Sequence, residues 1–128
     1  YAMTKALVSL ADMNNAYDVV AGKHTLIENP GLNVGIAIDV RKGEPRQLLV
    51  PNIKGCENLN FGQFWAAYEA VVRKARAGKL EFADFQGTTA TLTNPGGIGT
   101  VASAPRLMPG QDHIPILAGA GAVHRPAG

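Results

Sequence analysis

The stretch from residue 91 to residue 100, Thr-Leu-Thr-Asn-Pro-Gly-Gly-Ile-Gly-Thr, sets a β-branched run directly before a proline and three glycines. Threonine favours a pleated strand, and the strand must end at Pro95 because proline cannot donate a ladder hydrogen bond. The glycines then allow a sharp turn or a close approach. A hydroxyl held at such a strand end beside a tight turn would be rigid enough to stabilise a developing oxyanion. The alternative interpretation is that a strand simply stops at a Pro-Gly turn.

An amphipathic helix is predicted over residues 60–77. Asn60 is a favourable N-cap, and Gln63 three residues later completes a capping box. Gly78 is a natural C-terminal stop. Apolar residues at helical spacing form one broad stripe, which we expect in the core or in an interface: Phe61, Phe64, Trp65, Tyr68, Val71, Val72 and Ala75.

The rest of the chain alternates short strands with turns. The expected elements are a helix at 1–10, a hairpin at 17–27, and strands at 33–40, 48–53, 88–94 and 116–123. Pro51 marks the strand at 48–53 as an edge strand or a bulged one. This order predicts an α/β (α+β) sandwich in which a mixed sheet carries helices on one face.

Composition fits one domain and argues against several classes of function. The 128 residues suffice for one domain with its own core. Charged residues make up 17%, below the ~25% typical of globular domains, which indicates a compact monomer or a surface hidden in an oligomer. The net charge is +2 and the basic run at 73–76 lies near a helix end, so we expect no nucleic-acid binding. No run approaches the ~18 apolar residues of a membrane span.

Cys56 is the single cysteine. It cannot form an internal disulfide and has no partner at metal-ligand spacing, so we expect no metal site. A lone thiol fits a cytoplasmic location. The chain opens at Tyr1 in a helical pattern, without an initiator methionine or a signal peptide, and we expect it to be a piece of a longer protein.

Four motifs, in the same order over nearly the whole chain, resemble one known family. Residues 33–39 look like its "NxGxAxD" strand, 49–54 like "LVVPVIK", 75–87 like "ARxGKLxxxDxxG" and 91–99 like "TxTNxGxxG". The family is the catalytic domain of the dihydrolipoamide acyltransferase component of 2-oxo acid dehydrogenase complexes. The segments 64–69, 93–100 and 103–111 are similar to one branch of it, the acyltransferase-like domain fused to a thiamine-dependent 2-oxoglutarate dehydrogenase or decarboxylase in actinobacteria.

The resemblance implies a chloramphenicol-acetyltransferase-like fold that assembles as a homotrimer with active sites between subunits. It implies coenzyme A on one side, the lipoamide of a partner lipoyl domain on the other, and a histidine as general base. The hydroxyl that stabilises the tetrahedral intermediate falls on Thr93. The expected cofactor-binding residues are Asp39, Asn94, Gly96 and Gly97. Thiamine diphosphate and Mg²⁺ would be needed only by a multifunctional parent, whose partners would be other 2-oxo acid dehydrogenase components.

The family's terminal histidine motif is not matched. His124 follows the last expected strand directly, Pro126 would disturb its loop, and no aspartate comes after it, so we interpret it as a surface histidine. His113 is expected in a polar loop and His24 in the hairpin, both apart from the chemistry. Residues 1–128 are therefore expected to be a single, truncated acyltransferase catalytic domain that holds the oxyanion donor and lacks the base.

Two functions remain open. The first is transfer of an acyl group, succinyl in this branch, between dihydrolipoamide and coenzyme A. The second is a non-catalytic assembly core of a thiamine-dependent enzyme, favoured by the low charge and by strand faces of small residues such as Gly35 and Ala37. A stand-alone acetyltransferase of the same fold would need its own catalytic histidine.

Overall fold

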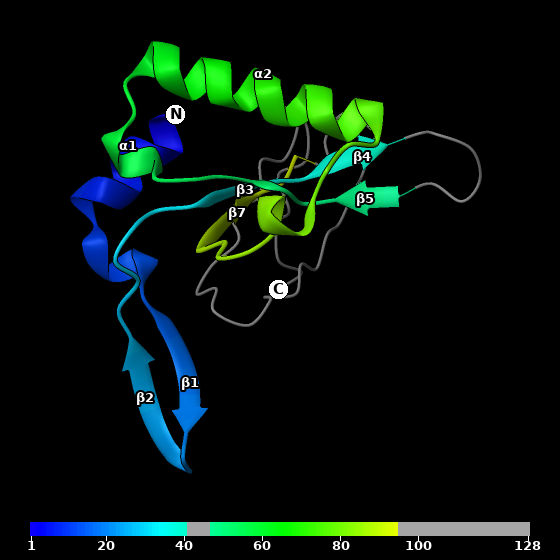
Figure 1. Cartoon of the computed structure of the whole chain (residues 1–128). Coiled ribbons are helices and arrows are strands. Elements are labelled where there is room, and N and C mark those ends of the chain that lie inside the picture. Colours follow the sequence, from blue (N-terminus) through cyan, green and yellow to red (C-terminus); the bar gives the residue numbers. More distant parts are fainter. Residues whose placement is uncertain (41–46, 95–128) are drawn as a thin grey trace, which may run out of the picture.

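The computed structural model describes residues 1–40 and 47–94, and Figure 1 shows the arrangement of their elements. The helical elements are α1 (Ala2–Ser9), η1 (Ala11–Asn14), η2 (Cys56–Asn58), α2 (Phe61–Ala77) and η3 (Phe82–Asp84). The strands are β1 (Ala16–Val20), β2 (Lys23–Ile27), β3 (Val34–Ile36), β4 (Ile38–Val40), β5 (Gln47–Leu49), β6 (Asn52–Ile53) and β7 (Ala90–Leu92).

Helix α2 has the bounds that its end signals predict. The Asn60 side chain accepts a hydrogen bond of 2.9 Å from the backbone N–H of Gln63, and the Gln63 side chain accepts one of 3.0 Å from the N–H of Asn60. This is the predicted capping box. At the other end Gly78 takes the left-handed conformation, with φ of 67°, so the helix stops where glycine allows the chain to turn back.

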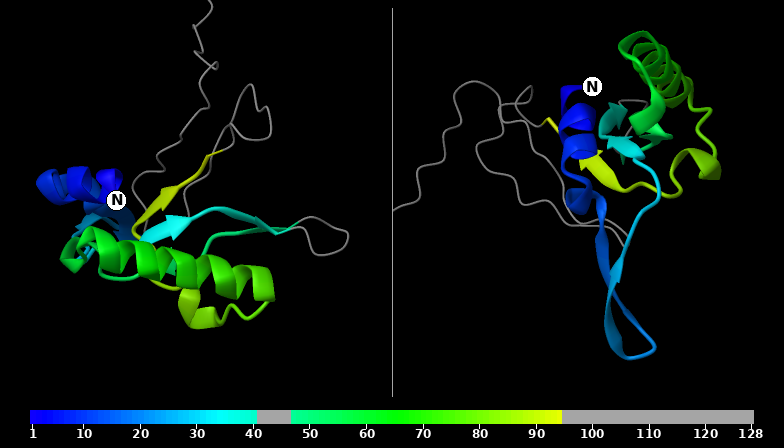
Figure 2. Two further views of the ribbon diagram at one scale, coloured as in Figure 1. Left: turned by 90° about the horizontal axis from the view of Figure 1, so that it is seen from above. Right: turned by 90° about the vertical axis from the view of Figure 1, so that its left-hand side faces the viewer.

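The predicted hairpin is formed by β1 and β2. Its two turn residues, Ala21 and Gly22, both have positive φ, which is the geometry of a two-residue hairpin turn that matches the strand twist. The register places Tyr17 opposite Leu26 and Val19 opposite His24. The hairpin projects away from the rest of the described chain (Figure 1 and Figure 2).

The central sheet is mixed, as predicted. Its strand order is β6-β3-β7, with β6 antiparallel to β3 and β7 parallel to it. A parallel neighbour requires a crossover connection, and here the crossover carries α2, which lies across one side of the sheet (Figure 1).

The two strands predicted at 33–40 and 48–53 are each divided in two, so the prediction of continuous strands is wrong. The division follows a change of partners: β3 pairs with β6 and β7, whereas β4 pairs with β5. Ala37 lies at the first break and still donates its N–H to the carbonyl of Leu92 at 3.1 Å. Pro51 lies at the second and accepts a hydrogen bond of 2.8 Å from the N–H of Ile36.

Alternation along the strands gives the central sheet two different faces. One row, in which Val34 lies opposite both Ile53 and Ala90, is buried in a hydrophobic cluster with Leu7 of α1 and Phe64 of α2. The next row is polar or small and points to the other side: Gly35 lies opposite Asn52 and Thr91. The helices therefore cover one face of the sheet, as the predicted sandwich requires.

The apolar stripe of α2 is only partly in this core. Phe64 and Ala75 are buried, and Tyr68 and Val71 pack against the cluster half-buried. Trp65, in contrast, is 52% exposed, and its ring lies 5.7 Å from that of Tyr68. Aromatic surface of this kind remains outside the core in the single chain.

Candidate functional site

Thr93 directly follows β7 and is half-buried. The backbone hydrogen bonds between β7 and the β3 segment extend to Leu92, the residue before Thr93, whose carbonyl accepts the N–H of Ala37. Since Ala90 belongs to the core cluster, alternation puts the side chains of Thr91 and Thr93 on the opposite face. The hydroxyl predicted as the oxyanion donor thus stands at a strand end on the polar face of the sheet.

The other predicted site residues are distributed as follows. Asp39 lies exposed in the middle of β4, opposite Leu48, two residues beyond the Ala37 that borders Leu92. Asn94 is exposed and adjoins Thr93. Gly96 and Gly97 lie outside the described residues. The segment that leads to Asp39 therefore contacts the end of β7 at Ala37, through the hydrogen bond to Leu92.

The sequence predicts Thr88 and Thr89 within the strand at 88–94, but both residues precede β7, because their side chains make other hydrogen bonds. Thr89 donates its N–H to the carbonyl of Asn33 at 3.0 Å, and its hydroxyl oxygen accepts the N–H of Asn33 at 3.1 Å. The Asn33 side chain also donates to the carbonyl of Gly87 at 2.7 Å and accepts the N–H of Gly55 at 2.9 Å. Asn33 therefore ties the start of β3 to the segment that leads into β7.

Asn52 holds the same segment from the other side of β3. Its side-chain amide donates to the hydroxyl oxygen of Thr88 at 2.7 Å and to the carbonyl of Gln86 at 2.9 Å. The side chain is buried, with 3% of the residue exposed. Sequence reasoning missed the role of both asparagines, although Asn33 opens the first quoted motif and Asn52 lies in the second, because their bonding partners are far away in the sequence.

The only histidine within 1–40 and 47–94 is His24. It lies on β2, hydrogen-bonded to Tyr17 with the two rings stacked at 5.7 Å, on the hairpin that projects away from β7 (Figure 1). It is therefore not placed to act on a group at Thr93. His113 and His124 lie outside the described residues.

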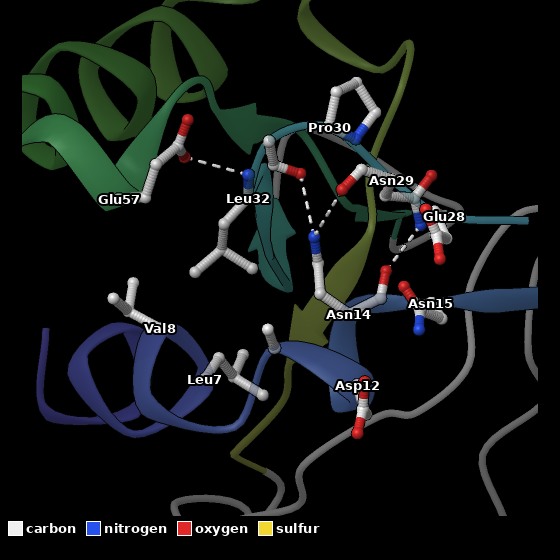
Figure 3. A pocket seen from close by; sticks show the side chains of 12 residues that line it. Leu7, Val8, Asp12, Asn14, Asn15, Glu28, Asn29, Pro30, Leu32 and Glu57 are labelled. Carbon is white, nitrogen blue, oxygen red and sulfur yellow. Dashed lines mark hydrogen bonds between the residues drawn. The ribbon is translucent and has the colours of Figure 1, made fainter.

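A cavity of about 360 Å³ lies between α1, η1, the β2–β3 connection and η2 (Figure 3). The Asn14 side chain donates to the carbonyl of Gly31 at 3.0 Å, and the Glu57 carboxylate accepts the N–H of Leu32 at 2.8 Å. None of the predicted site residues lines it. We interpret these bonds as holding the β2–β3 connection against η1 and η2.

The described residues show no cluster of three or more His, Cys, Asp or Glu side chains that could hold a metal ion. A hydrophobic helix of membrane-spanning length is likewise absent from the part of the chain that the structure describes.

The fold and the position of Thr93 define a class: an α+β domain with a mixed sheet, helices on one face, and a hydroxyl at the end of the last described strand. Residues 1–126 match the family described as 2-oxoacid dehydrogenases acyltransferase (catalytic domain). The chain belongs to this family.

Curated relatives are considerably longer proteins. The chain is 51% identical over 128 residues to the 2-oxoglutarate dehydrogenase E1/E2 component of Corynebacterium glutamicum, covering 99% of the chain and 10% of that protein. It is 48% identical, with the same coverage, to the multifunctional 2-oxoglutarate metabolism enzyme of Mycolicibacterium vanbaalenii. The chain thus spans about one tenth of the length of the relatives it matches.

Solved structures agree with this assignment. A probable dihydrolipoamide acetyltransferase from Listeria monocytogenes aligns with a TM-score of 0.71 and 30% identity, over 88% of this chain and 45% of that one. The Azotobacter vinelandii dihydrolipoamide acetyltransferase, in which a serine, a histidine and an asparagine were investigated for their role in catalysis, aligns with a TM-score of 0.71 and 29% identity, over 88% of this chain and 44% of that one. These likenesses confirm the predicted chloramphenicol-acetyltransferase-like architecture.

Proposed function

We propose that this domain transfers a succinyl group between dihydrolipoamide and coenzyme A within a 2-oxoglutarate dehydrogenase system. The observation that carries the proposal is the hydroxyl of Thr93 at the polar end of β7, in a chain whose family match covers residues 1–126. The choice of succinyl rests on the C. glutamicum relative, which is a 2-oxoglutarate dehydrogenase component.

The proposed reaction is a thioester exchange. The thiol of coenzyme A gives its proton to a histidine base and its sulfur attacks the thioester carbonyl of succinyl-dihydrolipoamide. The carbonyl oxygen becomes an oxyanion, to which the Thr93 hydroxyl donates a hydrogen bond. The intermediate then collapses, the carbon–sulfur bond to dihydrolipoamide breaks, and the leaving thiolate takes the proton back from the histidine.

We assign the coenzyme A side of the site to Asp39 and to the turn with Asn94, Gly96 and Gly97. Asp39 is an exposed residue of β4, and the segment that leads into this strand is hydrogen-bonded to the end of β7 through Ala37 and Leu92. We propose that the histidine base belongs to a part of the longer protein beyond residue 128 and is supplied by a neighbouring copy across a homotrimer interface; His24 lies on the hairpin away from Thr93.

We further propose that the chain is one domain of a longer, cytoplasmic, multifunctional protein, which the 10% coverage of its relatives supports. Its partners would be a lipoyl domain and the other 2-oxo acid dehydrogenase components. Thiamine diphosphate and Mg²⁺ would belong to another domain, and we assign no residue of this chain to them.

The test is the Thr93→Ala substitution in the full-length protein. We expect kcat for release of coenzyme A from succinyl-coenzyme A and dihydrolipoamide to fall about 10²–10³-fold, the usual effect of removing an oxyanion donor, with KM values unchanged. Thr93→Ser keeps the hydroxyl and should retain most of the activity. An unchanged kcat in Thr93→Ala would remove Thr93 from the mechanism.

The second candidate is a non-catalytic assembly core, favoured by the aromatic surface that α2 leaves exposed around Trp65. In that case the full-length protein would show no succinyl transfer to dihydrolipoamide, while deletion of this domain would still disrupt its assembly. The wild-type measurement therefore separates the two functions before any substitution is made.

A further inference from the structure

The placement of Thr93 depends on the pairing of β7 with β3. In the described central sheet β7 has β3 as its one ladder neighbour, since the strand order is β6-β3-β7. Asn33 fixes the start of this pairing through the N–H groups of Thr89 and Ala90. The bond from Ala37 to Leu92 fixes its end, one residue before Thr93. The middle of the pairing contains Gly35, opposite Thr91.

Gly35 leaves no room for a side chain. A Cβ atom at this position would lie 2.9 Å from the Thr91 hydroxyl oxygen and 2.9 Å from the Thr88 methyl group. It would also lie 3.2 Å from a methyl group of Val50. Gly35 lies in a regular strand without positive φ, so glycine is required here by the close approach of its neighbours rather than by the backbone conformation.

These neighbours are poorly able to move aside. Thr88 and Thr91 are buried, with 8% and 6% of each residue exposed. The Thr88 hydroxyl is also held by the Asn52 amide at 2.7 Å, and the χ1 angles of β-branched residues are stiff. An added methyl group at Gly35 would therefore move the strand β7 itself, because its side chains have no low-cost alternative.

We propose that Gly35 is a positioning residue for Thr93: its missing side chain sets how closely β7 lies against β3, and so where the Thr93 hydroxyl is held. Thr91 and Thr93 share one face of the strand, so a shift at Thr91 is transmitted to the next side chain on that face. A misplacement of about 1 Å can lower a rate about 10²-fold. This proposal rests on the role of Thr93 proposed above.

The experiment compares Gly35→Ala with Gly62→Ala in the full-length protein. A Cβ at Gly62 would meet the Asn60 side-chain oxygen at an ordinary 3.5 Å, so this control adds a methyl group without a collision. We expect Gly35→Ala to lower kcat of succinyl transfer about 10- to 100-fold with KM unchanged, and Gly62→Ala to keep wild-type kinetics. A folded Gly35→Ala protein with wild-type kcat would overturn the proposal.

A variant from which the colliding atoms have been removed distinguishes an effect of strand spacing from general destabilisation. Thr88→Ser removes the methyl group and keeps the hydroxyl bonded to Asn52, and Thr91→Ala removes the hydroxyl oxygen. We expect the triple variant Gly35→Ala/Thr88→Ser/Thr91→Ala to recover kcat to within about threefold of the Thr88→Ser/Thr91→Ala double variant. A folded triple variant that stays as slow as Gly35→Ala would show that spacing is not the cause.

A further variant keeps the test decisive if Gly35→Ala does not fold. Gly35→Ala/Thr91→Ala removes one of the two 2.9 Å collisions and keeps the one with the Thr88 methyl group, and we expect its kcat to lie below that of Thr91→Ala with KM unchanged. A folded Gly35→Ala/Thr91→Ala protein with the kcat of Thr91→Ala would overturn the proposal. Thr93→Ala separates the two hypotheses: if it keeps full activity, the proposed function fails, whereas if only Thr93→Ala is slow, the function stands and positioning by Gly35 fails.

Discussion

The side-chain amide of Asn52 donates a 2.7 Å hydrogen bond to the hydroxyl oxygen of Thr88, and both residues are buried. This bond connects β6 to the segment that enters β7, across the intervening strand β3. Removing one partner of a buried bond leaves the other unsatisfied, which costs about 1–3 kcal/mol. The pair should therefore matter for the stability of the domain as a whole.

We predict that Asn52→Leu and Thr88→Val each lower the free energy of unfolding by about 1–3 kcal/mol, measured by urea denaturation. The double variant should lose less free energy of unfolding than the sum of the two single losses, because neither partner of this bond is then left unpaired. Losses that add to within about 0.5 kcal/mol, as they do for independent sites, would show that the two side chains do not depend on each other.

The capping box gives a second prediction. Asn60→Ala removes the side-chain acceptor for the N–H of Gln63 and should lower the free energy of unfolding by about 1 kcal/mol. Asn60→Ser keeps a capping oxygen and should remain close to the wild-type protein. If thermal unfolding places both variants at the same melting temperature, the cap does not stabilise α2.

Cys56 gives a prediction about reactivity and pH. Its thiol is completely buried and donates to the Ile53 carbonyl at 3.1 Å. Burial raises the pKa of the Cys56 thiol above its ordinary value, since the thiolate would lose its hydration. We expect no reaction of the native protein with a thiol reagent at neutral pH, and full reaction after unfolding. Modification of the folded protein at the rate of a free thiol would contradict this burial.

The raised pKa of Cys56 also determines how the free energy of unfolding depends on pH. The folded state holds the thiol proton more tightly than the unfolded state, so the contribution of Cys56 to stability is complete below the pKa of an unfolded cysteine, about 8.5. It falls as the pH rises above that value. The free energy of unfolding should therefore decrease more steeply between neutral and alkaline pH in the wild-type protein than in Cys56→Ala.

The contribution of Asp84 to stability should depend on pH in the opposite direction. The N–H of Glu81 donates to its carboxylate at 2.8 Å and Lys74 lies 3.0 Å away, and these contacts, the N–H first, lower the pKa of Asp84. Its stabilising effect is present above about pH 3.9, the pKa of an unfolded aspartate, and is lost as the pH falls through the lower folded pKa.

We therefore expect Asp84→Asn to lower the free energy of unfolding by less than about 1 kcal/mol at neutral pH, as is usual for exposed ion pairs. The difference from the wild-type protein should vanish in acid. Glu69→Gln, which changes an exposed carboxylate on α2, serves as the control. An acid titration followed by circular dichroism would contradict the assignment if both variants behaved alike.

Elements fixed by neighbouring residues could be predicted from the sequence. The start of α2 follows from Asn60 and Gln63, and its end follows from Gly78, because each signal acts on the backbone within one turn. The hairpin turn at residues 21–22 is local in the same sense. The position of Thr93 at a strand end was likewise predictable, because a proline follows two residues later.

Features that depend on distant partners could not be predicted in this way. The residues 34–40 alternate without interruption, yet the strand divides at Ala37 because β3 and β4 have different partners. The close approach at Gly35 depends on Thr88 and Thr91, which are far away in the sequence. Asn52 stands where the quoted family motif has an apolar residue, and this difference is the one signal that could have indicated its buried bond to Thr88.

The parallel pairing of β3 with β7 has a consequence for synthesis of the protein. The bond from Asn33 to Thr89 spans 56 residues, which a ribosome adds in about 3–11 s at its usual rate of 5–20 residues per second. During that interval β3 has emerged with one edge unpaired, open to the wrong partner. Strand β7, with Thr93 beside it, closes that edge late, so that the nascent chain positions Thr93 only after the helix that covers the sheet has been made.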